Sequence, residues 1–251
     1  MIECSVKEGI AIVTLRHGKA NALDIELCDA LAAKFVELRD DGSKATVIAG
    51  QGRIFSAGVD LIRVSNGGAA YIRQFLPSLH RLYDTMFYHP KPVVAAINGH
   101  AIAGGCVLAC CADRRLMADN GGRIGVTELL VGVPFPALAF EILRFAVPGR
   151  YLAEFTLSGA TYPADTALEC GWIDEIAEPE DLIEDALAIA AELAELSPPA
   201  FAQNKRQLRQ AVTERMAQSG EATDRAVTEI WTAPAALASI RDYVARTLRK
   251  S

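Results

Sequence analysis

Hydrophobic and polar residues follow two different periods near the start of the chain. Apolar side chains alternate with polar ones over residues 2–6 and again over residues 10–15, with Gly9 in the turn between the two runs. This period of two, interrupted by a glycine turn, predicts a β-hairpin. Residues 25–42 instead carry apolar side chains at intervals of three and four and end at a glycine, which predicts a helix.

Strand-like and helix-like patterns then alternate through the middle of the chain. Short apolar runs predict strands over residues 45–52, 93–99 and 123–128. Helical spacing predicts a helix from residue 71 that ends before Pro90. Small-residue turns join these segments, so that strand-turn-helix units recur. Such alternation is typical of the α/β class.

The last third of the chain is predicted to be mainly helical. Helical spacing begins at Ala164 and is strong over residues 182–196. Ser197, Pro198 and Pro199 then interrupt the pattern before it resumes toward the C-terminus. We therefore predict two parts: a core of residues 1–197, and a C-terminal helical part of residues 198–251.

Composition narrows the class of protein. The chain has 251 residues, of which 51% are hydrophobic, enough for one large domain or a domain with an appendage. Its formal net charge of −6 argues against a basic surface that follows nucleic-acid phosphates. No apolar segment typical of a signal peptide follows Met1. We expect a cytoplasmic protein without a nucleic-acid partner.

Residues 92–112 form an uncharged stretch that is long enough to span a bilayer. Asn98, Gly99 and His100 lie at its centre, however, and would break a helix and be costly in lipid. A strand, a turn and a buried helix fit this stretch better, so we expect no membrane association.

The cysteines and histidines do not suggest a metal site. Cys106 and Cys110 are four residues apart and would share a helix face, but no further ligand follows them at a suitable spacing. The four histidines form no ligand pattern either. We expect reduced cysteines that pack in the core, and no bound metal.

Two small-residue turns are the first sign of chemistry. Gly104 and Gly105 directly precede a small, apolar run that is predicted to be a buried helix. Glycines at such a start leave backbone N–H groups open to a ligand oxygen at the positive end of the helix. Ala57 and Gly58 offer a second turn of this kind. If the two turns converge, they form an oxyanion hole; tight helix packing is the alternative explanation of the glycines.

Four motifs then point to a family. They are KANAL at Lys19–Leu23, FSAGVDL at Phe55–Leu61, NGHAIAGGC at Asn98–Cys106 and IGVTELLVGVP at Ile124–Pro134. In this order and at this spacing they resemble the crotonase family, the acyl-CoA hydratases and isomerases. Each motif is weak alone, but four in order are a specific signal. The resemblance continues into the segment LSGATYPADTALECGWIDEI.

The resemblance implies a crotonase-like spiral of strand-strand-helix units with a C-terminal helical appendage, assembled as a homotrimer or a dimer of trimers. It implies an acyl-CoA thioester as substrate, with CoA as part of that substrate and no separate cofactor. The thioester oxygen is expected between the backbone N–H groups of Ala57 and Gly104. The residues expected to bind CoA and substrate are Lys19, Ala20, Ser56, Gly58, Val59, Asp60 and Leu61.

The hydratases that this chain resembles carry two glutamates, and only the second has a counterpart here. Val107 stands at the first position and Glu128 at the second. Adding water needs one group to activate the water and another to handle the α-proton, so half of that pair is missing. One carboxylate still suffices to move a proton between carbons, as in the similar single-glutamate Δ3,Δ2-enoyl-CoA isomerases. In an apolar pocket Glu128 would be a stronger base; otherwise it is merely the exposed face of a half-buried segment.

Other positions depart from the family pattern or fit a structural role. Ala103 stands where many relatives have a glycine, and Pro134 and Phe135 replace a glycine-rich stretch. Val107, Pro134 and Phe135 are predicted to shape the wall of the acyl pocket. The remaining nearby acids fit backbone bonding, helix capping or ion pairs better than catalysis: Asp60, Asp113 and Asp119.

The leading hypothesis is an enzyme of fatty acid metabolism that converts a 3-enoyl-CoA into the 2-enoyl-CoA. In this hypothesis Glu128 moves the proton, and the oxyanion hole holds the enolate. One alternative is a different family reaction through the same enolate, namely hydration, thioester hydrolysis, or formation or cleavage of a carbon–carbon bond. Another is an acyl-CoA-binding protein without catalysis.

Overall fold

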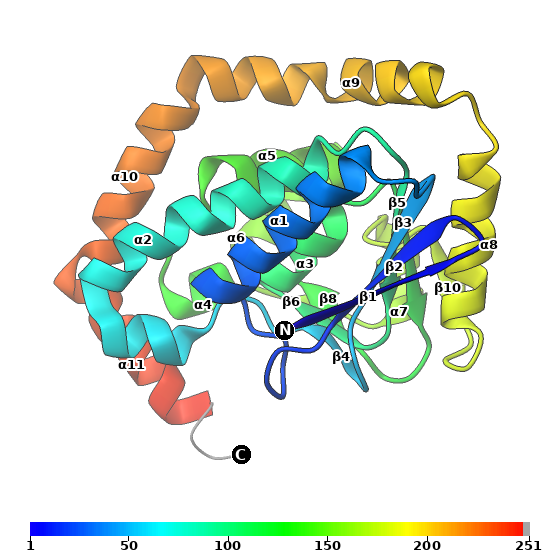
Figure 1. Ribbon diagram of the computed structural model, residues 1–251. Coiled ribbons are helices and arrows are strands. Elements are labelled where there is room, and N and C mark those ends of the chain that lie inside the picture. Colours follow the sequence, from blue (N-terminus) through cyan, green and yellow to red (C-terminus); the bar gives the residue numbers. More distant parts are fainter. Residues whose placement is uncertain (248–251) are drawn as a thin grey trace.

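The structure, a computed structural model, describes residues 1–247 (Figure 1). The last residues of the predicted C-terminal part, 248–251, lie outside this description. Ten strands form two sheets. Their bounds are β1 Ile2–Lys7, β2 Ile10–Leu15, β3 Ala45–Ala49, β4 Ile54–Ser56, β5 Val93–Ile97, β6 His100–Ile102, β7 Arg114–Ala118, β8 Ile124–Gly125, β9 Thr161–Tyr162 and β10 Glu175–Ala177.

The helices cover these sheets and build the far end of the molecule (Figure 1). Their bounds are α1 Ile25–Asp40, α2 Leu61–Phe87, α3 Gly104–Cys110, α4 Glu128–Val131, α5 Ala137–Ala146, α6 Gly149–Ser158, α7 Ala164–Cys170, α8 Leu182–Ala194, α9 Pro198–Arg215, α10 Glu221–Thr232 and α11 Pro234–Thr247. A π-helical turn, Met216–Gly220, joins α9 to α10.

From β3 to β8, consecutive strands alternate between the two sheets. The larger sheet has the order β1-β2-β3-β5-β7-β10, and the smaller one has the order β4-β6-β8-β9. Neighbours are parallel except in the β1–β2 hairpin and the β8–β9 pair. Thus β3, β5 and β7 each lead into one strand of the smaller sheet, after which helices return the chain. This is the strand-strand-helix spiral that the sequence predicted, and the N-terminal hairpin is confirmed as well.

The larger sheet is buried on both faces in its middle. Every residue of β3 and β5 is buried, and the side chains separate by the period of two. Val94 and Ala96 pack toward α8, whereas Val93, Ala95 and Ile97 belong to the main core with α1, α2 and α3. The sheet therefore fixes the strand ends from which the turns of the site emerge.

The C-terminal helices run around the outside of the core. In Figure 1, α9 passes along the top from α8, and α10 and α11 descend on the opposite side beside α2. Both α10 and α11 contact α2, and α11 also contacts α4. Helix α9 begins at Pro198, the predicted boundary, but the division into two parts at that point stays a prediction. Over residues 1–247, no helix is long and apolar enough to cross a membrane.

Several elements differ from the sequence prediction. Helix α2 begins at Leu61 rather than residue 71, because Asp60 caps it and the helical run continues across a kink at Gly68. His100 was predicted in a turn but begins β6, which pairs with β4 and β8. The predicted strand 123–128 is cut to two residues, and Glu128 begins a helix. The short strands β6 and β8 depend on pairing with partners distant in sequence.

Candidate active site

The two glycines at the start of α3 allow close approach of three chain segments. A Cβ atom on Gly105 would lie 2.3 Å from the Ser56 carbonyl oxygen, at the end of β4. A Cβ atom on Gly104 would lie 2.9 Å from the Tyr83 hydroxyl on α2. Tight packing therefore does explain the glycine pair. It leaves the Gly104 N–H group as the first, unbonded donor of a helix, so the two explanations are compatible.

The turn after β4 lies directly against this helix start. A Cβ atom on Gly58 would lie 2.9 Å from the Gly104 nitrogen. In this turn the Ala57 N–H group donates to the Ala20 carbonyl oxygen at 3.0 Å, and the Gly58 N–H group donates to Ser56 Oγ at 3.2 Å. Ala57 therefore has no free N–H group for a ligand, in disagreement with its predicted role.

Val59 supplies the free N–H group of this turn. The Leu23 N–H group donates to Gly58 O, and the Asp60 N–H group donates to Leu23 O, so Leu23 bonds the peptides on both sides of Val59. Within residues 1–247, neither the Val59 nor the Gly104 N–H group has a hydrogen-bond acceptor. The side chain of Val59 also faces Gly104, because a Cβ atom there would lie 3.6 Å from Val59 Cγ2. The two turns thus lie against each other, and the free N–H group of the first turn belongs to Val59 rather than Ala57; an oxyanion hole formed by Val59 and Gly104 stays a prediction.

Ala103 holds a strained backbone next to this donor pair. It has φ 52° and ψ −124°, a conformation that L residues other than glycine rarely adopt. Its carbonyl oxygen accepts bonds from the Cys106 and Val107 N–H groups, so the conformation turns the chain from β6 into α3. This is the position where the sequence lacks an expected glycine.

Tyr83 supports the helix start from behind. Its hydroxyl is fully buried and donates to the Gly104 carbonyl oxygen at 2.9 Å. Burial raises the pKa of this phenol well above its usual value, so the hydroxyl keeps its proton and stays a donor. This role was not predictable from the sequence, because Tyr83 follows the ordinary helical spacing of core residues in α2.

Glu128 is a buried carboxylate without a charged partner. It is the first residue of α4, it is 8% exposed, and its Oε2 atom has no hydrogen-bond partner within residues 1–247. Burial raises the pKa of Glu128 to about 7, although the backbone N–H groups of Glu128 and Thr127 partly oppose this. At neutral pH the group can both accept and donate a proton.

Glu128, Val59 and Ala103, the residue before Gly104, line one cavity of about 730 Å³. Its lining combines apolar side chains such as Val131, Val133 and Trp231 with charged ones such as Lys19 and Arg63. Predicted residues in the lining are Lys19, Ala20, Ala57, Val59, Asp60, Leu61 and Glu128.

The other acids that line this cavity are already bonded. Asp24 caps α1 through the Leu27 N–H group and lies 2.6 Å from His17 Nε2. Asp60 caps α2 through the Arg63 N–H group, in line with the predicted backbone role. Glu128 is therefore the acid of the lining that is free to react.

The remaining predicted residues lie behind or beside the cavity. Ser56 is buried and donates to the Asn21 carbonyl oxygen at 2.7 Å, so its hydroxyl holds the turn. Val107 is buried in α3, one turn after Gly104. Pro134 and Phe135 were predicted in the acyl pocket but line a separate cavity, because the chain after α4 directs them to the other side.

Sequence reasoning missed two aromatic residues in the lining, Trp231 of α10 and Tyr243 of α11. Both come from beyond residue 197, in the part that was predicted to be an appendage. Their only signal was helical spacing with other apolar residues, which is shared by every amphipathic helix. Contact between α11 and α4 brings this part of the chain to the site.

A second largely buried carboxylate, Asp113, is fully paired. Its two oxygens lie 2.6 Å from Lys205 Nζ and 2.9 Å from Arg209 Nη2, and it accepts a hydrogen bond from the Val93 N–H group. Arg209 also stacks over the Phe87 ring and donates to the Phe87 carbonyl oxygen. The ion-pair role predicted for Asp113 is confirmed, and the ion pairs attach α9 to the core.

Comparison with known proteins agrees with this geometry. The sequence model of the enoyl-CoA hydratase/isomerase family matches residues 5–246. A putative enoyl-CoA hydratase of Thermus thermophilus is 36% identical over 76% of this chain and 77% of its own length. Mitochondrial enoyl-CoA delta isomerase 1 of Mus musculus is 32% identical over 73% of this chain and 64% of its own length.

A solved structure shows the same fold over the whole chain. The crystal structure of human mitochondrial delta3-delta2-enoyl-CoA isomerase matches with a TM-score of 0.94 at 22% identity, covering 100% of this chain and 99% of that one. The chain thus belongs to the enoyl-CoA hydratase/isomerase family, with the crotonase fold that its motifs predicted.

Proposed function

We propose that this chain is an enoyl-CoA isomerase that moves the double bond of a 3-enoyl-CoA to the 2-position. The observation that carries the proposal is a single free carboxylate, Glu128, in a cavity that Val59 and Ala103 also line, with unbonded N–H groups at Val59 and at Gly104, which follows Ala103; Val107 occupies the position of a second acid. The similarity to the mouse isomerase supports this choice. Because the similar Thermus protein is named a putative hydratase, hydration is the competing reaction.

The reaction needs only these groups. The Glu128 carboxylate takes a proton from C2, and the electron pair moves into the thioester carbonyl. The enolate oxygen accepts hydrogen bonds from the Val59 and Gly104 N–H groups. Glu128 then returns the same proton to C4, so that the product has the mass of the substrate. A carboxyl with a pKa of about 7 suits both steps, because neither protonation state is strongly favoured.

We assign the first donor to Val59 rather than Ala57 because the Ala57 N–H group is already bonded to Ala20. A backbone donor is tested by moving its turn. In Gly58→Ala, the new Cβ would lie 2.6 Å from the Ile102 carbonyl oxygen, at a backbone φ of +80°. We expect kcat to fall about 10²–10³-fold, the cost of losing one oxyanion donor.

Hydration is disfavoured by the occupied acids of the cavity. Asp24 and Asp60 both cap helices, and Val107 brings no charge, so a second free carboxylate to activate water is missing from the lining within residues 1–247. Thioester hydrolysis, carbon–carbon bond chemistry and binding without catalysis are the further alternatives. Each of them predicts a different product.

The deciding experiment incubates purified protein with trans-3-hexenoyl-CoA and separates the products by chromatography with mass detection. We expect the 2-enoyl isomer at unchanged mass, and its loss in Glu128→Gln. Glu192→Gln, a matched change at an exposed site on α8, is the control that keeps full activity. A product heavier by one water means a hydratase, free CoA means a hydrolase, and no turnover of any enoyl-CoA means a binding protein.

Three further properties were predicted from the sequence and its family resemblance. Assembly as a homotrimer or a dimer of trimers stays a prediction, which size-exclusion chromatography with light scattering can test. The cytoplasmic location and the absence of a separate cofactor also stay predictions. Turnover by protein that has been dialysed against a chelator would support the latter.

A further inference from the structure

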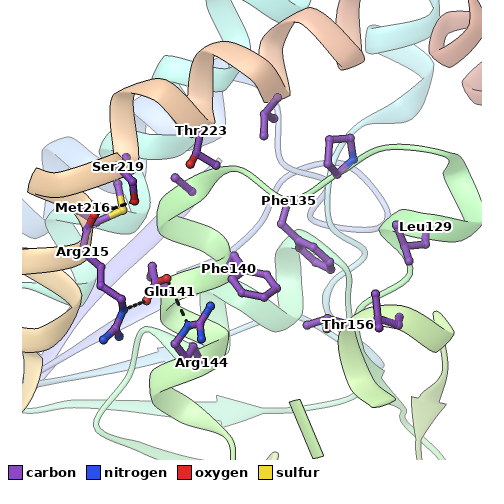
Figure 2. A pocket seen from close by; sticks show the side chains of 15 residues that line it. Leu129, Phe135, Phe140, Glu141, Arg144, Thr156, Arg215, Met216, Ser219 and Thr223 are labelled. Carbon is purple, nitrogen blue, oxygen red and sulfur yellow. Dashed lines mark hydrogen bonds and ion pairs between the residues drawn. The ribbon is translucent and has the colours of Figure 1, made fainter. Parts of the chain in front are cut away.

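A second cavity of about 470 Å³ lies beside the active-site cavity. Figure 2 shows it between α4, α5 and α6 on one side and the start of α10 on the other. Leu129, Phe135 and Phe140 give it an apolar surface, and Glu141 forms ion pairs with Arg144 and Arg215 at its edge (Figure 2). Nothing in the proposed reaction uses this space.

One segment of the chain, residues 128–134, borders both cavities. In α4, Glu128 lines the active-site cavity and the next residue, Leu129, lines the second one. After α4 the same change occurs between Val133 and Pro134. The two cavities therefore lie on opposite sides of this segment, which forms part of the partition between them.

Trp231 completes this partition from α10. It lines the active-site cavity, while Val227, one helical turn earlier, lines the second cavity. Its indole N–H group donates to the Pro134 carbonyl oxygen at 2.8 Å, and the residue is 2% exposed. This bond fixes the large ring against the partition, so the ring is a rigid end and not a movable lid.

The structure assigns to Trp231 the control of acyl chain length: its ring ends the acyl part of the active-site cavity, and the second cavity is the space into which a longer chain would extend without it. The inference rests on the proposed function in that it takes an acyl-CoA as the ligand. The substrate class is therefore limited to chains that end before the Trp231 ring.

Buried methylenes make this limit measurable. Each methylene that leaves water for an apolar cavity tightens binding by about fourfold. In the wild-type protein, affinity should rise with chain length up to the ring and then stop rising. Removing the ring should extend the rise, because the added carbons enter the second cavity.

The experiment measures the affinity of the whole protein for saturated acyl-CoAs by titration calorimetry. The series runs through butyryl-, hexanoyl-, octanoyl-, decanoyl-, dodecanoyl- and hexadecanoyl-CoA. Saturated chains cannot isomerise, so the result does not depend on the reaction and a failure of the isomerase proposal is detected separately. The variants are Trp231→Ala and the milder Trp231→Leu, each checked for folding by circular dichroism.

We expect the length at which affinity stops rising to be shortest in the wild type, longer in Trp231→Leu and longest in Trp231→Ala. A double variant, Trp231→Ala with Val227→Phe, refills the second cavity and should shorten the limit again. The same limit in wild type and in both single variants would overturn the inference. So would a wild-type affinity that still rises to hexadecanoyl-CoA, or a double variant that keeps the extended limit.

Discussion

Glu128 and Asp113 are both carboxylates withdrawn from water, and the chain treats them in opposite ways. Asp113 meets two cations and a backbone N–H group at the contact between α9 and the core. Glu128 meets no charged side chain, and one of its oxygens has no hydrogen-bond partner within residues 1–247. Both sites withdraw a carboxylate from water, but only the Asp113 site compensates its charge with cations.

The difference separates a structural acid from a reactive one. Burial without compensation is costly, and it persists where the unsatisfied group has a task. The pKa of Glu128 rises to about 7 for this reason. At the Asp113 site, burial lowers the pKa of Lys205 to about 8, while the negative charge of Asp113 partly opposes this shift. The Asp113 cluster shows how the same fold satisfies an acid when no reaction is required.

Removing the unpaired acid should have the largest effect on activity. In Glu128→Gln we expect kcat to fall about 10²–10⁴-fold, because the base that moves the proton is gone. The free energy of unfolding should not decrease, since a costly buried charge disappears. Steady-state kinetics and urea denaturation measure the two effects. A variant that keeps most of its activity would show that the comparison with Asp113 misidentified the reactive group.

Removing the paired acid should have the opposite signature. Asp113→Asn leaves Lys205 and Arg209 buried without a counter-charge, so we expect the free energy of unfolding to fall by about 3–5 kcal/mol. The kcat of the protein that remains folded should be unchanged. Asp29→Asn, which breaks the exposed pair with Arg81, is the control and should cost less than about 1 kcal/mol. A loss of kcat with intact stability would contradict the structural role of Asp113.

The pH dependence should distinguish the two acids further. Because the pKa of Glu128 is raised from 4.5 to about 7, its ionisation destabilises the folded state as pH rises through this window. We expect the advantage in unfolding free energy of Glu128→Gln over the wild type to grow by about 3 kcal/mol between these pH values. Over the same range the wild-type kcat/KM should rise and level off above about pH 7, as the base ionises. Parallel stability curves for the two proteins would contradict the raised pKa.

Tyr83 tests how far the reactive site depends on hydrogen bonds behind it. Tyr83→Phe keeps the ring and removes the bond to the Gly104 carbonyl oxygen, which is worth about 1 kcal/mol. If that bond positions the Gly104 donor, kcat should fall about fivefold with KM unchanged. A change in stability with unaltered kcat would assign Tyr83 to packing alone.

Ala103 offers the smallest change. Its positive φ is a strain that glycine would relieve, at the cost of more freedom in the unfolded chain. We expect Ala103→Gly to raise the free energy of unfolding by about 0.5–1 kcal/mol. Thermal unfolding with a kcat measurement tests this, and a lower melting temperature would contradict the strain.

Much of the fold was readable because its signals are local. The hairpin, the strands at the middle of the larger sheet and the helix after Gly105 follow from hydrophobic period and glycine position. The start of α2 at Leu61 and the two-residue strand β8 were missed. The start of α2 lies before two glycines, Gly67 and Gly68, that interrupt the helical pattern, and the strand β8 is defined by pairing with the distant β6, which a short sequence window does not contain.

Some residues of the site were likewise predictable from the sequence, whereas others were identified only by the structure. Motif order indicated Glu128 and the two turns, because the residue types and spacing are written in the sequence. The choice of Val59 over Ala57 as the donor could not be predicted from the sequence. It depends on which N–H group the distant Ala20 and Leu23 carbonyl oxygens leave free. Likewise Trp231 reaches the cavity only because α10 and α11 pack back onto α2 and α4.

The sequence by itself thus determined the family, the α/β spiral and the single acid at position 128, because these depend on residue identity and local period. Only the tertiary structure decided that Glu128 is unpaired while Asp113 is paired, and that Trp231 lines the cavity that contains Glu128. Those properties arise from burial and from contacts between segments far apart in the chain. Desolvation and pairing depend on such contacts and not on neighbours in sequence.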